Sequence, residues 1–152
     1  EIRVNFRKVF DNGEEGLKDT ENSKAIRPWE HVLEPLSGYL LLGQKMYEES
    51  SKYCEGWNFG PNLDSIVPVW EIGEKIIKYY GSGKLEDKSK KGELHEAKLL
   101  ALDITKARFK LGWKPRWDID RAIEKTVEWY KNYSSEDVYG LCVKQIEEFI
   151  GE

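Results

Sequence analysis

The sequence has no long apolar run, since its longest uninterrupted stretches, such as Tyr39 to Leu42, span only four residues. A membrane-spanning helix needs about 20 apolar residues, and no basic and apolar leader begins the chain. We therefore expect a cytoplasmic protein that does not enter a membrane. An excess of one charge is also absent, because 24 basic residues face 28 acidic ones and the formal net charge is −4. This balance gives no indication of the one-sided basic surface that binds nucleic acid.

Cysteine and histidine are scarce, with two of each among the 152 residues. Cys54 and Cys142 lie far apart without a C-x-x-C motif, which predicts reduced, buried thiols rather than a disulfide framework. The pair His95-Glu96 begins like the zinc-protease motif H-E-x-x-H, but Leu99 stands where the second histidine would be needed. We therefore expect no metal site.

The chain also lacks a glycine-rich turn that could cradle the phosphates of a cofactor. No G-x-x-G-x-x-G pattern follows an apolar strand, and Gly81-Ser82-Gly83 leads into charged residues. Tyr80 and Lys84 have the spacing of a dehydrogenase catalytic pair, but two glycines between them oppose the helix that would align their side chains. We therefore expect no catalytic residue and no bound NAD, and the chain alone is predicted to be inactive.

What the sequence does contain is a helix-rich pattern with 39% apolar residues, enough for one core. Apolar periodicity and capping residues predict helices over 35–47, 68–80, 119–130 and from 136 to 150, and a short helix after Asp103 that stops at Gly112. A β-prone run at 57–59 predicts a short strand, and an apolar run at 98–102 predicts a buried strand or an extended segment. The chain is therefore expected to form a single helix-rich α+β domain over residues 1–152.

Arg27, Trp29 and His31 stand together just before the first of these predicted helices. An arginine can hold a phosphate through two parallel hydrogen bonds, and the free N–H groups of a helix start add to such a site. A plainer interpretation is a surface arginine that pairs with Glu30 or Glu34 beside a core tryptophan. Spacing alone favours the plainer interpretation.

Longer sequence motifs around Arg27 favour the phosphate-binding interpretation instead. The stretch AIRPWEHVLEPLSGY, residues 25–39, closely resembles the R-P-W-Q-H-V-L-E-P-L-x-G-Y signature of CDP-glucose 4,6-dehydratases, which are extended short-chain dehydrogenases acting on nucleotide sugars. Further stretches that resemble the same family are WNFGP at 57–61, HEA at 95–97, LGWKPRW at 111–117, and the two closing helices at 124–130 and 144–149.

The resemblance covers the chain from Asn12 onward, but it corresponds only to the C-terminal half of the family. It implies the substrate-binding part of such an enzyme, without the N-terminal Rossmann half that binds NAD and carries the catalytic tyrosine and lysine. The complete enzyme would use NAD to oxidise the sugar at C4, eliminate water across C5 and C6 and return the hydride to C6. Its product, CDP-4-keto-6-deoxyglucose, serves deoxysugar biosynthesis for the lipopolysaccharide O-antigen.

Residue by residue, the resemblance implies that Arg27 contacts the diphosphate of CDP-glucose or a related nucleotide sugar, and that Asn58 lines the same site. His95 and Glu96 fall near a position where related enzymes carry another phosphate-binding arginine, so they are further substrate-binding candidates in spite of that difference. His31 is expected to support its neighbours rather than react.

The tryptophans are expected to be structural. Trp29 is predicted to pack against the helix that follows it. Trp113 and Trp117 flank a proline-fixed connector, and an aromatic pair in such a place is more often part of a core than a platform for a base. We therefore predict core positions for both.

Two alternatives remain beside the nucleotide-sugar interpretation. The chain could be a stand-alone helical module, derived from such an enzyme, that binds a protein partner, or a piece of a longer protein without a role of its own. The nucleotide-sugar interpretation requires Arg27 and Asn58 to converge on one pocket. The resemblance also implies that the chain alone exposes an open strand edge at 57–59 and an apolar helix face at 36–47, which favours self-association. The alternative is that the four later helices close over this gap and give an ordinary monomer.

Overall fold

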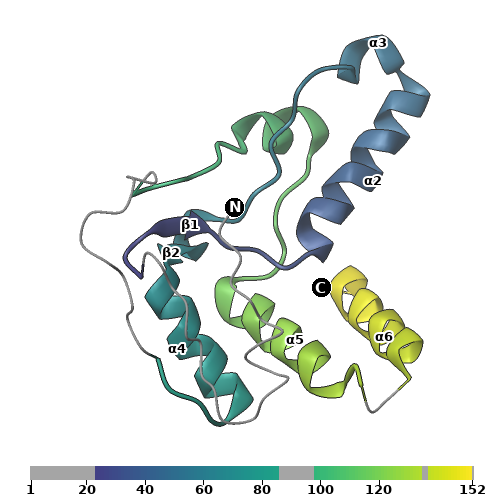
Figure 1. Cartoon of the computed structure of the whole chain (residues 1–152). Helices are drawn as coiled ribbons and strands as arrows, with labels where there is room; N and C mark the ends of the chain where they lie inside the picture. The colour runs from purple at the N-terminus through teal and green to yellow at the C-terminus, as the bar shows by residue number, and fades with distance from the viewer. Residues whose placement is uncertain (1–22, 86–97, 135–136, 152) are drawn as a thin grey trace.

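The computed structural model describes residues 23–85, 98–134 and 137–151, which form helices and a very small sheet that lies at one side, next to α4 (Figure 1). Strands β1 (Ile26–Pro28) and β2 (Ile66–Pro68) pair antiparallel. The helices are α2 (Leu33–Glu48), α3 (Ser50–Tyr53), α4 (Val69–Tyr80), α5 (Ile119–Asn132) and α6 (Val138–Gly151), with a 3-10 turn η1 (Leu63–Ser65) and a π-helical turn η2 (Ala107–Leu111). The predicted helix-rich α+β class is confirmed for these residues.

The helices begin and end close to where the sequence predicts. The carboxylate of Asp118 accepts a hydrogen bond from the backbone N–H of Arg121 at 2.8 Å and so caps α5. Helix α4 ends at Gly81, which takes the left-handed conformation with φ of 94°. Helix α2 starts at Leu33, two residues before Pro35, because the first turn of a helix tolerates a proline.

The predicted strand at 57–59 is wrong. These residues are irregular, and the strands lie instead at β1 and β2, where Arg27 is paired with Val67. The physical reason is that Phe59 is a buried anchor of a side-chain cluster, so the run is held by packing rather than by a ladder.

The predicted strand at 98–102 is correct only in part. Ile26 donates its N–H to the carbonyl of Lys98 at 2.9 Å and accepts from Leu100 at 3.0 Å, which makes a single parallel bridge. The expected burial is wrong, since Leu99 and Leu100 are 60% and 48% exposed. The segment is thus an added edge on β1, with apolar side chains that the described residues do not cover.

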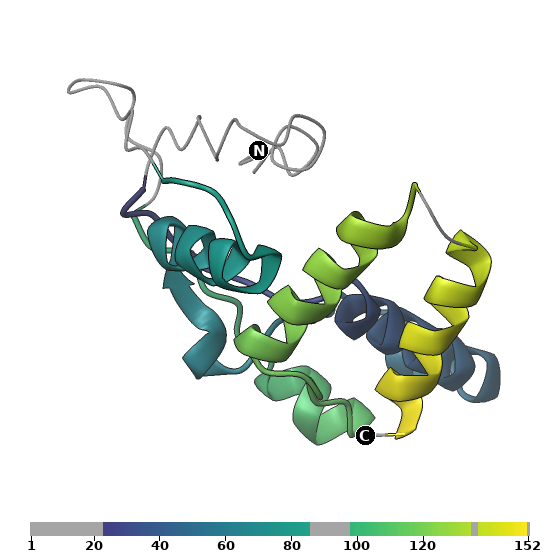
Figure 2. The ribbon, with the colours of Figure 1, turned by 90° about the horizontal axis from the view of Figure 1, so that it is seen from below.

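One hydrophobic core lies between α4 and α5, which are neighbours in both views of the ribbon (Figures 1 and 2). Its buried members are Ile72, Ile76, Ile119, Ile123 and Val127. Trp29 packs against this core and donates its indole N–H to the carbonyl of Val67 at 3.0 Å. The structural role predicted for Trp29 is confirmed, with its packing on the core between α4 and α5, while packing against the following helix, α2, stays a prediction.

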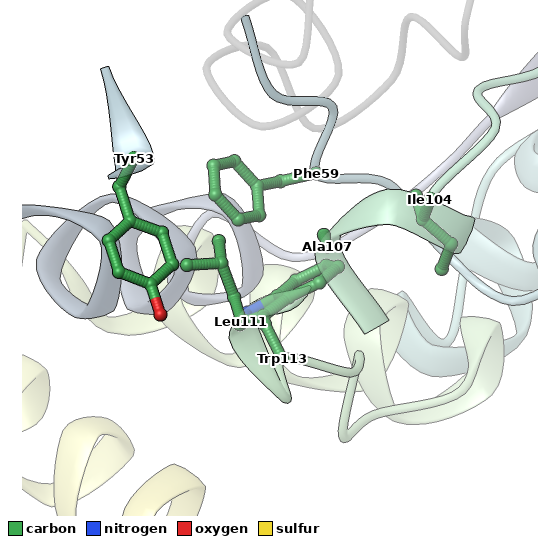
Figure 3. Close-up of a cluster of buried hydrophobic side chains, with 6 residues drawn as sticks. All are labelled: Tyr53, Phe59, Ile104, Ala107, Leu111 and Trp113. Carbon is green, nitrogen blue, oxygen red and sulfur yellow. The ribbon is translucent and has the colours of Figure 1, made fainter. Parts of the chain in front are cut away.

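A second core joins α2, α3 and η2, and Figure 3 shows its buried side chains. These are Tyr53, Phe59, Ile104, Ala107, Leu111 and Trp113. Gly38 of α2 lies directly on the ring of Phe59, where an added Cβ would come within 2.3 Å of a ring carbon. Only a glycine lets α2 approach so closely.

The predicted core positions of the two connector tryptophans are confirmed, because Trp113 and Trp117 are 4% and 3% exposed. The thiols differ from expectation. Both are free of disulfides, but Cys54 is exposed and Cys142 is only half-buried, so the prediction of buried thiols is wrong for Cys54.

Two absences apply to the three described ranges alone. No helix there has the length and apolar character needed to cross a membrane. The same residues contain no group of three or more histidine, cysteine, aspartate or glutamate side chains that could hold a metal ion.

Candidate functional site

Arg27 is held at the middle of the small sheet. Its backbone pairs with Val67 on one side, while the neighbouring Ile26 bonds to residues 98–100 on the other. Because side chains alternate along a strand, Arg27 projects from the opposite face to Ile26 and Pro28. Its guanidinium donates from Nη1 to the carbonyl of Ile26 at 2.8 Å, and the residue is half-buried. The sheet thus fixes the backbone of Arg27, and the hydrogen bond to Ile26 holds its guanidinium.

Asn58 is presented by a loop between two anchored aromatic residues. Trp57 donates its indole N–H to the carbonyl of Tyr53 at 3.0 Å, and Phe59 is buried in the second core. The exposed amide of Asn58 donates to the carbonyl of Asp103 at 3.3 Å. The loop is therefore fixed on both sides, and it presents Asn58 as an exposed residue.

One segment connects the two predicted substrate-binding residues. Residues 98–100 bond to β1 next to Arg27, and Asp103 a few positions later accepts from Asn58. His95 and Glu96, the other two candidates, precede this segment but lie outside the described residues. The chain thus attaches Arg27 and Asn58 to the same short stretch, although their convergence on one pocket stays a prediction.

Two cavities lie elsewhere in the described ranges, and neither is lined by Arg27 or Asn58. The first, of about 580 Å³, lies between residues 29–33, α5 and α6. The second, of about 470 Å³, has a basic lining that includes Arg108, Lys114 and Arg116. A substrate held by Arg27 and Asn58 would therefore need walls beyond those that these cavities provide.

His31 supports the start of α2. It is 6% exposed, its Nδ1 accepts the N–H of Leu33 at 3.3 Å, and its ring centroid lies 5.0 Å from that of Trp117. Burial lowers the pKa of His31 to about 4, and the nearby charge of Lys125 acts in the same direction. The imidazole is neutral near pH 7, which fits the supporting role expected for it.

Glu34 is an important residue that sequence reasoning missed. It is only 1% exposed, and its carboxylate accepts the backbone N–H of Trp117 at 2.7 Å and that of Arg116 at 3.0 and 3.1 Å. Burial raises the pKa of Glu34, while these backbone hydrogen bonds act against the increase. A signal was present in the sequence, because Glu34 stands alone among apolar residues in VLEPL, as a buried polar anchor does.

The same connector is also tied to the end of α6. The guanidinium of Arg116 donates from Nη1 to the carbonyls of Phe149 and Ile150 at 2.9 and 3.0 Å. These carbonyls belong to the last turn of a helix, where no intrahelical donor remains and a cation is favoured. Residues 113–117 therefore bind α2 through Glu34 and α6 through Arg116.

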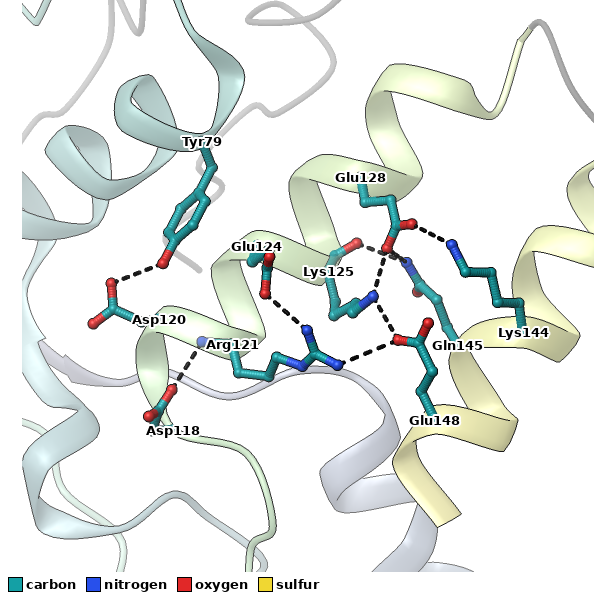
Figure 4. Close-up of polar contacts among 10 residues, drawn as sticks. All are labelled: Tyr79, Asp118, Asp120, Arg121, Glu124, Lys125, Glu128, Lys144, Gln145 and Glu148. Carbon is teal, nitrogen blue, oxygen red and sulfur yellow. Dashed lines mark hydrogen bonds and ion pairs between the residues drawn. The ribbon is translucent and has the colours of Figure 1, made fainter. Parts of the chain in front are cut away.

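A network of charges ties α5 to α6, as Figure 4 shows. The Lys125 side chain is 7% exposed and lies 2.8 Å from Glu128, with Glu148 as a second partner. Glu128 also accepts from Lys144 at 2.8 Å. Burial alone would raise the pKa of Glu128, but the hydrogen bonds from both lysines lower it to about 2. We interpret this set as a structural tie, since its lysines and glutamates satisfy one another.

Comparison with known proteins now adds to this geometry. No protein-family model matches the chain. Two curated enzymes that are named for nucleotide-linked glucose resemble it. One is the CDP-glucose 4,6-dehydratase of Salmonella typhimurium, 37% identical over 136 residues, which cover 90% of this chain and 37% of that protein. The other is the UDP-glucose 4-epimerase 2 of Oryza sativa subsp. japonica, 28% identical over 127 residues, which cover 80% of this chain and 28% of that protein.

The resemblance to CDP-glucose 4,6-dehydratases that the motifs indicate is therefore confirmed at the level of sequence. The chain spans little more than a third of the length of that relative and less than a third of the epimerase. What the two whole proteins do is consequently a matter of proposal for this chain.

Proposed function

We propose that this chain is the nucleotide-sugar-binding portion of an enzyme like CDP-glucose 4,6-dehydratase. The observation that supports the proposal most is the 37% identity to such an enzyme over 136 residues, which include the segments carrying Arg27 and Asn58. The substrate class is CDP-glucose or a related nucleotide sugar. The parent enzyme would form CDP-4-keto-6-deoxyglucose in the cytoplasm, for deoxysugars of the lipopolysaccharide O-antigen.

In this proposal Arg27 binds the diphosphate. A guanidinium presents parallel N–H donors that match phosphate oxygens, and β1 fixes the backbone from which it extends. Asn58 contributes an amide from its anchored loop and bonds to Asp103, while residues 98–100 of the same segment bond to Ile26 beside Arg27. His95 and Glu96, which stand two to three residues before Lys98, are assigned to the same site.

The chemistry belongs to the parent rather than to this chain. In the proposal, NAD accepts and returns the hydride, and a Rossmann half of the parent binds it and supplies the catalytic tyrosine and lysine. The described residues offer binding and positioning groups, namely a fixed guanidinium and an anchored amide. The chain alone is therefore proposed to bind without catalysing.

Replacing Arg27 by alanine tests the proposal. We expect affinity for CDP-glucose to fall about tenfold or more, because a charge-assisted hydrogen bond to phosphate contributes about 1.5–3 kcal/mol. Titration calorimetry on the full-length parent, or on this chain where it retains binding, measures the change. Arg108→Ala is the matched control, since Arg108 is an exposed arginine that pairs with Asn62. Equal affinities for the two variants would remove Arg27 from the site.

A second candidate function rests on one face of α2. Four apolar side chains at helical spacing are exposed there, namely Leu36 at 44%, Tyr39 at 58%, Leu40 at 77% and Tyr47 at 94%. A row of this kind normally marks a covered surface. In the nucleotide-sugar proposal this row is covered by the rest of the parent enzyme. In the alternative the chain is a helical module, and a separate protein partner covers the row.

We expect the isolated chain to self-associate at micromolar concentration through this α2 face and to bind a dye that reports exposed apolar surface. Leu40→Glu should shift sedimentation toward the monomer, because it places a charge in the middle of the row. Leu63→Glu is the control, since Leu63 is an equally exposed leucine on η1. A wild-type chain that sediments as a sharp monomer, without dye binding, would contradict the prediction and indicate a self-sufficient domain.

A further inference from the structure

The cavity between residues 29–33, α5 and α6 has the character of a small-molecule site. Its volume is about 580 Å³, and ligand pockets generally measure about 300–1,000 Å³. Isoleucines of α5 and Ile146 of α6 form aliphatic walls, and Trp129 and Tyr130 of α5 add aromatic ones. An apolar lining of this extent favours a ring system or a branched aliphatic group.

One polar group in the cavity wall is unsatisfied. The Oε2 atom of Glu30 is buried and has no hydrogen-bond partner among the described residues. A buried acceptor without a donor is costly, and a buried carboxylate without a counter-charge more so. An unsatisfied carboxylate on a residue that lines a cavity indicates that a donor is missing.

The described residues around Glu30 do not supply that donor. Glu34 on α2 adds a second negative charge, and His31 next to it is neutral. The titratable groups that α5 and α6 contribute to the lining are Tyr130 and Cys142, and neither carries a positive charge. Burial, with the charge of Glu34, raises the pKa of Glu30 to about 7.

We propose that this cavity binds a small, mainly apolar molecule that carries a protonated amine, with the ammonium donating to the Glu30 carboxylate. The ammonium supplies both the hydrogen bond and the counter-charge that Glu30 lacks, which a neutral hydroxyl cannot do. The apolar part of the ligand packs against Ile123, Trp129 and Ile146. This site is separate from the proposed nucleotide-sugar site, because neither Arg27 nor Asn58 lines the cavity.

Titration of the chain with tryptamine, followed by amide chemical shifts, tests the proposal. Tryptophol is the matched probe, since it keeps the indole and replaces the amine by a hydroxyl. Tryptamine should bind about tenfold tighter than tryptophol at about pH 8, because a charged pair replaces a neutral hydrogen bond. It should bind more weakly at about pH 5.5, because Glu30 is then protonated while the amine keeps its charge. Equal affinities of the two probes would overturn the proposal.

Three variants locate the site. Glu30→Gln should abolish the preference for tryptamine and its pH dependence, while Glu147→Gln, an equal charge change at an exposed position of α6, should change neither. Ile146→Trp should block both probes, because the larger ring fills the cavity from a position that is 42% exposed and therefore tolerant of substitution. Thermal unfolding confirms that each variant is folded. Undiminished tryptamine binding by folded Glu30→Gln or Ile146→Trp protein would also overturn the proposal.

Discussion

Replacing Glu34 by alanine is expected to destabilise the chain by about 3 kcal/mol or more. The substitution leaves the backbone N–H groups of Arg116 and Trp117 buried without an acceptor, and each such orphaned group costs about 1–3 kcal/mol. It also opens a gap between α2 and the connector 113–117. Urea unfolding followed by tryptophan fluorescence measures the loss, because Trp113 and Trp117 flank the site.

Two further variants serve as controls for Glu34→Ala. Glu34→Gln retains one amide oxygen of similar reach and should destabilise the chain less than alanine does. Glu48→Ala removes an exposed glutamate of the same helix, which pairs only with neighbouring α2 side chains, and should have little effect. An unfolding midpoint of Glu34→Ala equal to that of Glu48→Ala would show that the buried carboxylate does not anchor the connector.

Replacing Phe59 by alanine should be about as damaging, at about 3–5 kcal/mol. Phe59 is 7% exposed and meets the rings of Tyr39 and Trp113 edge to face, with centroids 5.5 and 5.0 Å away. Truncation removes both contacts and leaves a cavity that the rigid wall of α2 at Gly38 cannot close. The same denaturant titration measures the change.

The control for Phe59 lies on η2. Phe109 is 86% exposed, so Phe109→Ala removes an aromatic ring of equal size without opening a core and should change stability little. Phe59→Leu should fall between the two. A Phe59→Ala protein as stable as Phe109→Ala would mean that the second core does not depend on this ring.

Local signals in the sequence predicted most of the helical structure. Asp118 predicted the start of α5 because a cap acts on residues three positions away. Glycine at 112 predicted the end of η2, where φ is 71°. These features depend on neighbours along the chain, and a single sequence contains that information.

Long-range pairings could not be predicted in the same way. The partner of β1 lies about 40 residues away in β2, and nothing in the three-residue runs at 26–28 or 66–68 distinguishes them from irregular structure. The predicted strand at 57–59 failed for the opposite reason, since aromatic residues there serve packing rather than pairing.

In the candidate site, too, the residues in local motifs could be predicted and those with distant partners could not. Arg27 and Asn58 could be named because they stand in contiguous motifs that resemble a family. Glu34 could not be assigned its role, because its partners lie 82 and 83 residues later in the chain. The unsatisfied oxygen of Glu30 depends on the packing of three separate segments, which no local pattern describes.

The short connector 113–117 makes the two outer helices mechanically dependent on each other. It bonds to α2 through the Glu34 carboxylate and to the last turn of α6 through the Arg116 guanidinium. A partner that tilted α2 would either break the hydrogen bonds of Glu34 to the connector or move the connector with it. In the second case the hydrogen bonds between Arg116 and α6 would be strained. Because α6 also forms a wall of the apolar cavity, docking on the exposed face of α2 and occupancy of that cavity would both act on Arg116, which bonds to Glu34 through its backbone and to α6 through its guanidinium.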